Sequence, residues 1–301
     1  MAVPLDNHRR LLAAGLTAFA LLAAGCSSSD DSSPSGDTDT TSADVPQAIV
    51  SLSPTSTEML YAVGAGDQVV AVDDRSDYPA DAPVTDLSGY TPNVEAILGY
   101  EPDLVVANAD TADLVAGLEQ AGVETLILPA AENLDDTYAQ IEQLGAVTGH
   151  VGDAAELVAQ MKTDIDEILA GLPERETPLT YYHELDNTFY TVTDDTYIGE
   201  IYSMLGLTSI ATGGDGYPQL SAEYVLEQNP DVIFLADGQC CGVTPEVVAE
   251  RAGWGELTAV RDGQVYVLDE DIASRWGPRV VDLMREVARI VGTTPAAQPT
   301  P

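Results

Sequence analysis

The sequence predicts an α/β fold of two Rossmann-like lobes, each a parallel sheet flanked by helices, joined by one long helix with a cleft between the lobes. The first observation is a repeat: residues 95–106 and 223–234 lie 128 positions apart and share one pattern. Each copy has a glutamate, a short amphipathic stretch, a Pro-Asp pair and a run of branched apolar residues. This pattern indicates a short helix followed directly by a buried parallel strand.

Two further observations support the same fold. Strands and helices are expected to alternate along both halves of the chain, which is typical of a parallel sheet covered by helices on both faces. Both copies of the repeat are also preceded, in the same order, by a glutamate, a glycine and a Tyr-Pro pair. The first set is Glu58, Gly64 and Tyr78-Pro79, and the second is Glu200, Gly206 and Tyr217-Pro218.

The N-terminal lobe is expected over residues 47–150. An apolar strand at 48–52 leads into a helix from Pro54, which a serine or threonine can cap and which Gly64 or Gly66 can end. The later elements continue the alternation: strands at 69–72, 104–107 and 125–128, and helices from Glu95 and over 111–121.

One helix, expected over residues 151–173, connects the lobes. Residues 134–171 have helical periodicity with a break at the glycines near position 150, and Asp153 can cap the second part. Gly171 and Pro173 end it. Because a helix bends little, we expect the lobes to rock slightly rather than to open widely.

The C-terminal lobe is expected over residues 174–292, followed by a flexible tail over 293–301. Its expected strands are 179–183, 189–192, 231–236 and 264–268, and its expected helices are 196–205, 221–228, 244–251 and 277–291.

Composition narrows the classes of function. The chain has 301 residues and a formal charge of −39, with 50 acidic residues against 11 basic ones. Such a surface repels phosphate backbones and excludes nucleic-acid binding, although it suits a basic partner surface. No G-x-S-x-G, P-loop, H-E-x-x-H or G-x-G-x-x-G motif is present, so we expect no enzymatic activity.

The first 25 residues are expected to be a lipoprotein signal peptide. Arg9 and Arg10 precede an apolar run, 11–24, that is too short to span a bilayer as a mature helix. The run ends in LAAGC, which resembles the lipobox of prokaryotic lipoproteins, where the cysteine is diacylated. Lipidation of Cys26 would tether the domain to the outer face of the cytoplasmic membrane. An ordinary signal peptide with an incidental cysteine is the alternative, and residues 26–46, rich in Ser, Asp and Thr, are expected to form a disordered stalk.

The two remaining cysteines, Cys240 and Cys241, are adjacent. In an oxidising compartment two leftover cysteines often pair, and a bond between neighbours closes a small ring. Two reduced, partly buried thiols are an equally acceptable interpretation. Metal binding by a single Cys-Cys pair is disfavoured, because two adjacent ligands rarely close a tetrahedral site.

Several motifs between residues 47 and 292 occur together. They are Ser51-Leu-Ser-Pro-Thr-Ser-Thr-Glu58, Ser76-Asp-Tyr78-Pro79, Asn93-Val-Glu95, Pro102-Asp103-Leu-Val-Val and Ser221-Ala-Glu223. This set resembles the periplasmic binding proteins of metal-chelate ABC importers, which take up cobalamin, ferric siderophores and haem. The cobalamin-binding type is nearest over the first lobe. The resemblance implies a monomer of two α/β lobes that holds a metal chelate between them and needs no other cofactor.

The resemblance also implies a partner, an ABC permease dimer with cytoplasmic ATPase subunits. In the family one glutamate on each lobe docks onto arginines of the permease, and Glu95 and Glu223 stand at those positions. Two equivalent carboxylates suit a two-fold partner, and charge pairing steers the encounter. The alternative is that each glutamate only stabilises the first turn of a helix.

Ligand-binding candidates are side chains on loops that follow strands, where such folds bind ligands. Aromatic faces suit a flat macrocycle, and an arginine suits carboxylates of an anionic chelate. His183 could ligate a chelated metal, although a structural histidine is the alternative, and the aromatic candidates could be half-buried packing residues. The loop before Glu95 lacks the tryptophan of the cobalamin binder and offers Tyr90. The candidates are Tyr78, Tyr90, Tyr182, His183, Tyr217, Arg275 and Trp276.

We therefore expect a lipid-anchored solute receptor of an ABC importer, which captures a corrinoid such as cobalamin or a ferric siderophore. A haem receptor of the same family and a surface sensor lipoprotein without a transport role are the alternatives.

Overall fold

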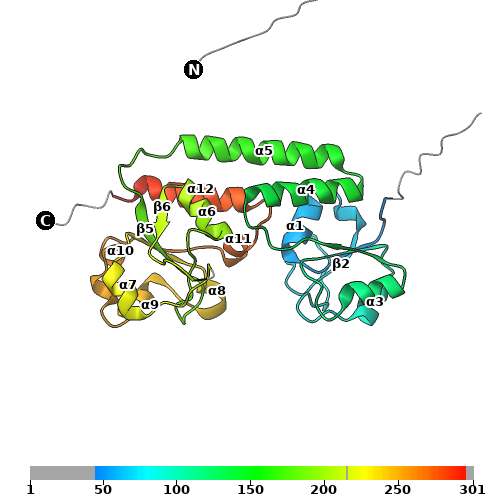
Figure 1. Ribbon diagram of the computed structural model, residues 1–301, viewed down its shortest axis with the longest axis horizontal. Coiled ribbons are helices and arrows are strands. Elements are labelled where there is room, and N and C mark those ends of the chain that lie inside the picture. The colour runs from blue at the N-terminus through cyan, green and yellow to red at the C-terminus, as the bar shows by residue number, and fades with distance from the viewer. Residues whose placement is uncertain (1–44, 215, 296–301) are drawn as a thin grey trace, which may run out of the picture. The chain divides into compact units, whose positions relative to one another are not determined.

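Two four-stranded sheets organise the chain, one in each half of the sequence (Figure 1). The computed structural model describes residues 45–214 and 216–295. In spatial order the first sheet contains β2 (Val69–Val72), β1 (Ile49–Ser51), β3 (Leu104–Ala107) and β4 (Glu124–Ile127). The second contains β6 (Leu207–Ser209), β5 (Leu179–Glu184), β7 (Val232–Leu235) and β8 (Val265–Val267).

All pairings between these strands are parallel, and the second sheet repeats the order of the first with each strand number raised by four. The predicted fold class, two parallel sheets flanked by helices, is confirmed. The strands are apolar and largely buried because helices cover both faces of each sheet.

Short helices follow the strands of the first lobe, and side-chain caps begin several of them. Ser53 caps the first helix and Asn93 the second, each by accepting a backbone N–H three residues later. The helices of this lobe are α1 (Pro54–Ala62), η1 (Gly66–Gln68), α2 (Val94–Leu98), α3 (Leu114–Gln120) and α4 (Leu134–Thr148).

The second lobe has more and shorter helices. Ser221 caps its α7 as Asn93 caps α2, so the repeated segments begin in the same way. The helices are α6 (Tyr197–Met204), α7 (Ala222–Gln228), α8 (Gly238–Cys241), α9 (Pro245–Glu250), η2 (Trp254–Glu256), α10 (Thr258–Arg261), α11 (Glu270–Ser274) and α12 (Val280–Thr293).

The Pro-Asp pair of each repeat fastens two neighbouring strands together. The Asp103 carboxylate accepts hydrogen bonds from the backbone N–H groups of Gln47 and Ala48, just before β1. The Asp231 carboxylate accepts from the N–H and hydroxyl of Thr180, at the start of β5. The repeated aspartate therefore sets where the middle strands of each sheet begin.

The prediction of a strand at 189–192 is wrong. Thr191 and Thr193 donate their backbone N–H groups to Pro218 and Gly216 in a neighbouring loop, and not to a strand of the sheet. The place beside β5 is taken by β6, which begins three positions after the last residue of α6.

A long helix, α5 (Val151–Ala170), lies in the segment expected to connect the lobes. Figure 1 shows it running over α4 and α12, and both helices pack against it. One apolar cluster runs through this region and contains Met59 of the first lobe, Met161 of α5, and Tyr202 and Met284 of the second lobe. The two lobes thus share a core along these helices, and each has a smaller core of its own on the far side of its sheet.

The predicted signal peptide, the Cys26 lipidation site and all of the stalk but its last residues lie outside the described residues, as does most of the predicted tail. Among the residues that the structure describes, no helix is both long and apolar enough to cross a membrane.

Candidate ligand-binding cleft

A pocket of about 830 Å³ lies between the two lobes and takes its lining from both. The first lobe contributes residues 53–55, which follow β1, residues 74, 75 and 77, which follow β2, Tyr90, and Asn108, which follows β3. The second lobe contributes residues after β7 and β8. These are Gln239, Cys240, Glu270, Asp271, Ser274, Arg275 and Trp276.

Most of the lining therefore comes from the carboxyl ends of parallel strands. In α/β folds this edge is where ligands bind, because loops and helix starts converge there while the strands hold them in place.

A cluster of charges, buried at its centre, joins the lobes at the wall of this pocket. Glu58 of α1 is 3% exposed, and its carboxylate accepts hydrogen bonds from Arg275 at 2.8 Å and from Arg279 at 2.9 Å. Arg275 also pairs with Asp271 at 2.6 Å and with Asp77 of the first lobe at 3.2 Å. We call these five residues the cross-lobe cluster.

The cross-lobe cluster sets how the lobes face each other. Only Glu58, Arg275 and Arg279 of this cluster are largely buried, and removing Glu58 leaves the two guanidinium groups without their buried partner, which typically costs about 3–5 kcal/mol. The predicted ligand residue Arg275 lines the pocket, but its guanidinium group is already occupied by three carboxylates, so no full positive charge is left for a ligand.

The pocket is acidic. Asp74, Asp77, Glu270 and Asp271 line it together with two cations, Arg75 and Arg275. Burial raises the pKa of Asp271, and burial also raises the pKa of Asp73, which lies just behind the wall and accepts a hydrogen bond from Ser76 at 2.5 Å. The carboxylates that remain ionised give the lining an excess of negative charge.

Two of the predicted aromatic residues line the pocket. Tyr90 is 79% exposed, and Trp276 is partly buried with its indole N–H donated to Gln140 of α4 at 3.0 Å. Tyr78 lies nearby, 46% exposed, with the Arg279 guanidinium 4.2 Å from its ring centre. Tyr217 is equally exposed but is not among the residues that line this pocket.

The expectation that Tyr182 and His183 face the ligand needs correction, because both side chains are completely buried. Tyr182 packs edge-on against Trp254 in the core of the second lobe. His183 Nδ1 lies 2.9 Å from the Tyr202 hydroxyl, and burial lowers the pKa of His183 to about 4. His183 is therefore a neutral structural histidine, which is the alternative given in the sequence analysis.

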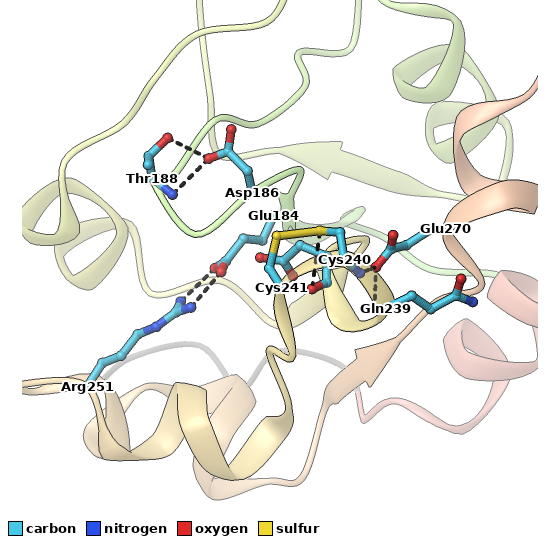
Figure 2. The surroundings of a disulfide bond; sticks show 9 residues. Glu184, Asp186, Thr188, Gln239, Cys240, Cys241, Arg251 and Glu270 are labelled. Carbon is cyan, nitrogen blue, oxygen red and sulfur yellow. Dashed lines mark hydrogen bonds and ion pairs between the residues drawn. A yellow bond between two sulfur atoms is a disulfide. The ribbon is translucent and has the colours of Figure 1, made fainter. Parts of the chain in front are cut away.

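A second buried charge cluster lies at the carboxyl edge of the second sheet (Figure 2). Glu184, at the end of β5, accepts two hydrogen bonds from Arg251 at 2.5 and 2.6 Å. Asp237, just after β7, is also fully buried, and neither of its carboxyl oxygens has a hydrogen-bond partner among the described residues. Burial and the Glu184 charge raise the pKa of Asp237 to about 7.

A disulfide joins Cys240 to Cys241 in α8, and Figure 2 shows it beside Glu270. The structure thus pairs the adjacent cysteines whose state the sequence left open. Among the described residues, no group of three or more His, Cys, Asp or Glu side chains is arranged to hold a metal ion.

Glu95 and Glu223 occupy equivalent positions in the two lobes. Each lies in the first turn of a short helix, α2 or α7, that leads into the third strand of its sheet, and each side chain is exposed. A first-turn carboxylate also stabilises its own helix, so this placement fits both interpretations of the sequence.

The sequence interpretation missed the polar wall of the pocket. Asp74, Asp77, Glu270 and Asp271 all follow predicted strands, so the rule that selected the aromatic candidates would have selected them too. The partnership of Glu58 with Arg275 and Arg279 joins residues more than 200 positions apart, and no local pattern signals it.

A family model described as "Periplasmic binding protein" matches residues 49–272. A Bacillus subtilis protein named as an ABC transporter substrate-binding lipoprotein, YvrC, is 32% identical over 255 residues, which cover 82% of this chain and 80% of that protein. A "Cobalamin-binding protein" of Halobacterium salinarum is 30% identical over 261 residues, covering 83% of this chain and 70% of the relative.

Among solved structures, the periplasmic vitamin B12-binding protein BtuF of Vibrio cholerae is similar, with a TM-score of 0.68 and 30% identity. The match covers 82% of this chain and 96% of BtuF.

Proposed function

The chain belongs to the periplasmic binding protein family, and from this premise we propose that it is an extracytoplasmic solute-binding lipoprotein of an ABC importer. It captures a metal chelate, foremost a corrinoid such as cobalamin, between its lobes and delivers it to a membrane permease. Members of this family are solute-binding proteins and not enzymes.

The observation that carries the proposal is the inter-lobe pocket. It lies at the carboxyl edges of both sheets, and its volume of about 830 Å³ falls in the range of roughly 300–1,000 Å³ usual for small-molecule sites. Tyr90 and Trp276 offer aromatic surface for the face of a macrocycle.

The charge of the pocket favours a corrinoid or a ferric hydroxamate over haem. Haem carries propionate carboxylates, which the acidic lining would repel, and Arg275 is already paired with protein carboxylates. The corrin ring of cobalamin carries amides in place of carboxylates along its rim, and the anionic phosphate of cobalamin lies in the nucleotide loop outside the ring. Two relatives with about 30% identity are named for binding cobalamin or vitamin B12, which agrees with this choice.

Membrane attachment and partners follow from the same proposal. Lipidation of Cys26 holds the domain at the outer face of the cytoplasmic membrane. Glu95 and Glu223 dock onto a two-fold permease, whose ATPase subunits supply the energy for transport. The chain itself works as a monomer without a resident cofactor.

The test is a titration of the full chain, purified in detergent, with cyanocobalamin, ferric desferrioxamine and haem. Trp276 lies in the pocket wall, so tryptophan fluorescence should report binding. Cyanocobalamin should bind at least about tenfold more tightly than haem, which corresponds to about 1.4 kcal/mol. Tyr90→Ala should weaken binding several-fold, because it removes exposed aromatic surface from the pocket.

Tyr100→Ala is the matched control, since Tyr100 is also exposed but does not line the pocket. Tighter binding of haem than of cyanocobalamin would refute the corrinoid assignment and leave the receptor role standing. Binding of none of the three chelates would contradict the receptor role and favour a surface sensor.

A further inference from the structure

The Cys240–Cys241 bridge lies in the wall of the inter-lobe pocket. Its helix, α8, begins three residues after β7 ends, at the carboxyl edge of the second sheet. Cys240 lines the pocket, and both cysteines are exposed. The bridge is therefore open both to a bound ligand and to a reducing agent. We refer to residues 238–242 as the disulfide turn.

One carboxylate anchors the disulfide turn to the neighbouring helix. The backbone N–H groups of Gln239 and Cys240 both donate to Glu270 Oε1, the latter at 2.9 Å (Figure 2). Glu270 belongs to α11, whose next residue, Asp271, pairs with Arg275 of the cross-lobe cluster. The disulfide turn is thus held by α11, the short helix that also contributes Glu270, Asp271 and Ser274 to the pocket lining.

Few other contacts hold the disulfide turn. Two backbone hydrogen bonds close it, from the Cys241 N–H to the Asp237 carbonyl and from the Gly242 N–H to the Gly238 carbonyl, both at 3.1 Å. None of the residues of α8 is buried, and a helix of four residues has no stability of its own. Gly242 ends it with a φ of +70°. The Cys240 sulfur reaches the Asp237 carbonyl only at 3.7 Å, and the first buried apolar side chain after the turn is Val243. Besides these two backbone hydrogen bonds, the bridge and the Glu270 anchor are therefore the constraints on the shape of the disulfide turn.

We propose that the Cys240–Cys241 bridge is a redox-sensitive element of the ligand-binding cleft, which holds the disulfide turn in its binding shape when oxidised and weakens ligand binding when reduced. The proposal rests on the proposed function. An extracytoplasmic compartment is oxidising, so the bridged form is the resting state.

The chemistry balances with a dithiol as reductant. One thiolate of the dithiol attacks a sulfur of the bridge and forms a mixed disulfide, and its second thiol displaces the cysteine. Cys240 and Cys241 gain two electrons and two protons between them, and the dithiol becomes a cyclic disulfide. With the bridge open the turn must be ordered again when ligand binds, and that cost lowers the affinity.

The experiment uses the full chain in detergent with cyanocobalamin as the probe. The protein is reduced with dithiothreitol, desalted without oxygen and checked by mass for the gain of two hydrogens. Reduction should raise Kd about tenfold, the effect of a modest ordering cost, and reoxidation of the same sample should restore it. The double variant Cys240→Ser/Cys241→Ser should bind as weakly as the reduced protein and should not respond to dithiothreitol.

Two glutamine variants test the anchor. Glu270→Gln should weaken binding with the bridge intact, since it removes the charged acceptor of two N–H groups. Glu256→Gln, an exposed change elsewhere in the same lobe, should have no effect.

Equal affinity of the oxidised, reduced and double-serine proteins would overturn the proposal and leave the proposed function intact. If the oxidised protein binds no cyanocobalamin, the proposed ligand is wrong. The role of the bridge is then tested without ligand, by amide hydrogen exchange of residues 238–243. Faster exchange after reduction supports the role of the bridge, and unchanged exchange overturns it.

Discussion

At the scale of single residues, the carboxyl edge of the second sheet holds one more buried acid than buried base. Arg251 neutralises Glu184 through two hydrogen bonds, and its guanidinium lies 4.7 Å from the ring centre of Trp254. Within the described part of the chain no cation pairs with Asp237, and its charged or titratable neighbours are Glu184, Tyr182 and Arg251, which is already paired with Glu184. A buried carboxyl in that setting is more stable when protonated.

Stability should therefore depend on pH through Asp237. Its pKa is about 7 in the folded chain and near the ordinary value of about 4 when unfolded. The folded state then holds this proton more tightly, so the stabilisation is fully present at low pH and is lost as pH rises through 7. The slope is at most about 1.4 kcal/mol per pH unit. Asp237→Asn should be nearly as stable as wild type near pH 4 and more stable than wild type near pH 8.

Urea unfolding of both proteins across this pH range measures the difference, with Asp262→Asn, an exposed change, as the control. A constant difference between Asp237→Asn and wild type at all pH values would show that another group titrates.

Residue-scale prediction from the sequence succeeded only in part, and the reason is physical. Position after a strand correctly selected Arg275 and Trp276 for the pocket lining, together with Tyr90 from a loop. The same rule failed for Tyr182 and His183, because helices cover both faces of a parallel sheet and bury side chains on either side up to the strand end. Which loops meet across the lobes depends on tertiary structure and cannot be read from local sequence.

At the scale of elements, the aspartate of the Pro-Asp pair has the same structural role in both copies of the repeat. Asp103 and Asp231 each accept two hydrogen bonds from the beginning of the adjacent strand, β1 or β5, although that strand lies about 50 residues away in sequence. Each aspartate thereby fixes how the central pair of strands is aligned.

Asp231→Ala should lower the free energy of unfolding by about 1.5–3 kcal/mol, the usual range for hydrogen bonds to a charged group. The Thr180 N–H and hydroxyl lose their partner, so amide exchange should accelerate in β5 first. Asp195→Ala is an exposed control in the same lobe. Equal exchange in β5 of the variant and wild type would rule out the fastening role.

The repeat made most central strands and the longer helices predictable. β2 and β3 have the expected bounds, and α4 and α5 break near the expected glycines. The structure departs from prediction where elements are very short: β6 has three residues, and α8 and α11 have four and five. Such elements are stabilised by tertiary contacts, as the hydrogen bonds from the α8 backbone to Glu270 illustrate. They have too few residues to show a helical or strand periodicity in the sequence.

At the scale of the whole described molecule, the two lobes are tied in two ways. They share an apolar core along α4, α5 and α12, and the cross-lobe cluster joins Glu58 and Asp77 of one lobe to Arg275 and Arg279 of the other. Both constraints limit relative motion of the lobes. If α2 and α7 are the docking helices, as we propose, these constraints hold them in a nearly fixed relation, so a partner can recognise their spacing.

The matched placement of Glu95 and Glu223 leads to a prediction about transport. Both carboxylates are exposed and neither lines the pocket, so replacing them should leave ligand affinity unchanged. If each meets a cation on one half of a two-fold permease, the double variant Glu95→Ala/Glu223→Ala should abolish uptake of the ligand. Each single variant should reduce uptake to a similar intermediate degree, because the two sites are equivalent.

Uptake by cells that carry the cognate permease, measured with labelled ligand, provides the readout, and ligand titration of each variant serves as the control. Glu119→Ala/Glu227→Ala is a matched double change, since both of these glutamates are exposed and lie at the ends of short helices, one in each lobe. This double change removes the same number of negative charges but leaves the first turns of α2 and α7 unchanged. Transport that survives the first double variant would mean that Glu95 and Glu223 do not dock the permease. Transport that falls equally in the second would mean that the permease responds to overall charge rather than to two paired carboxylates.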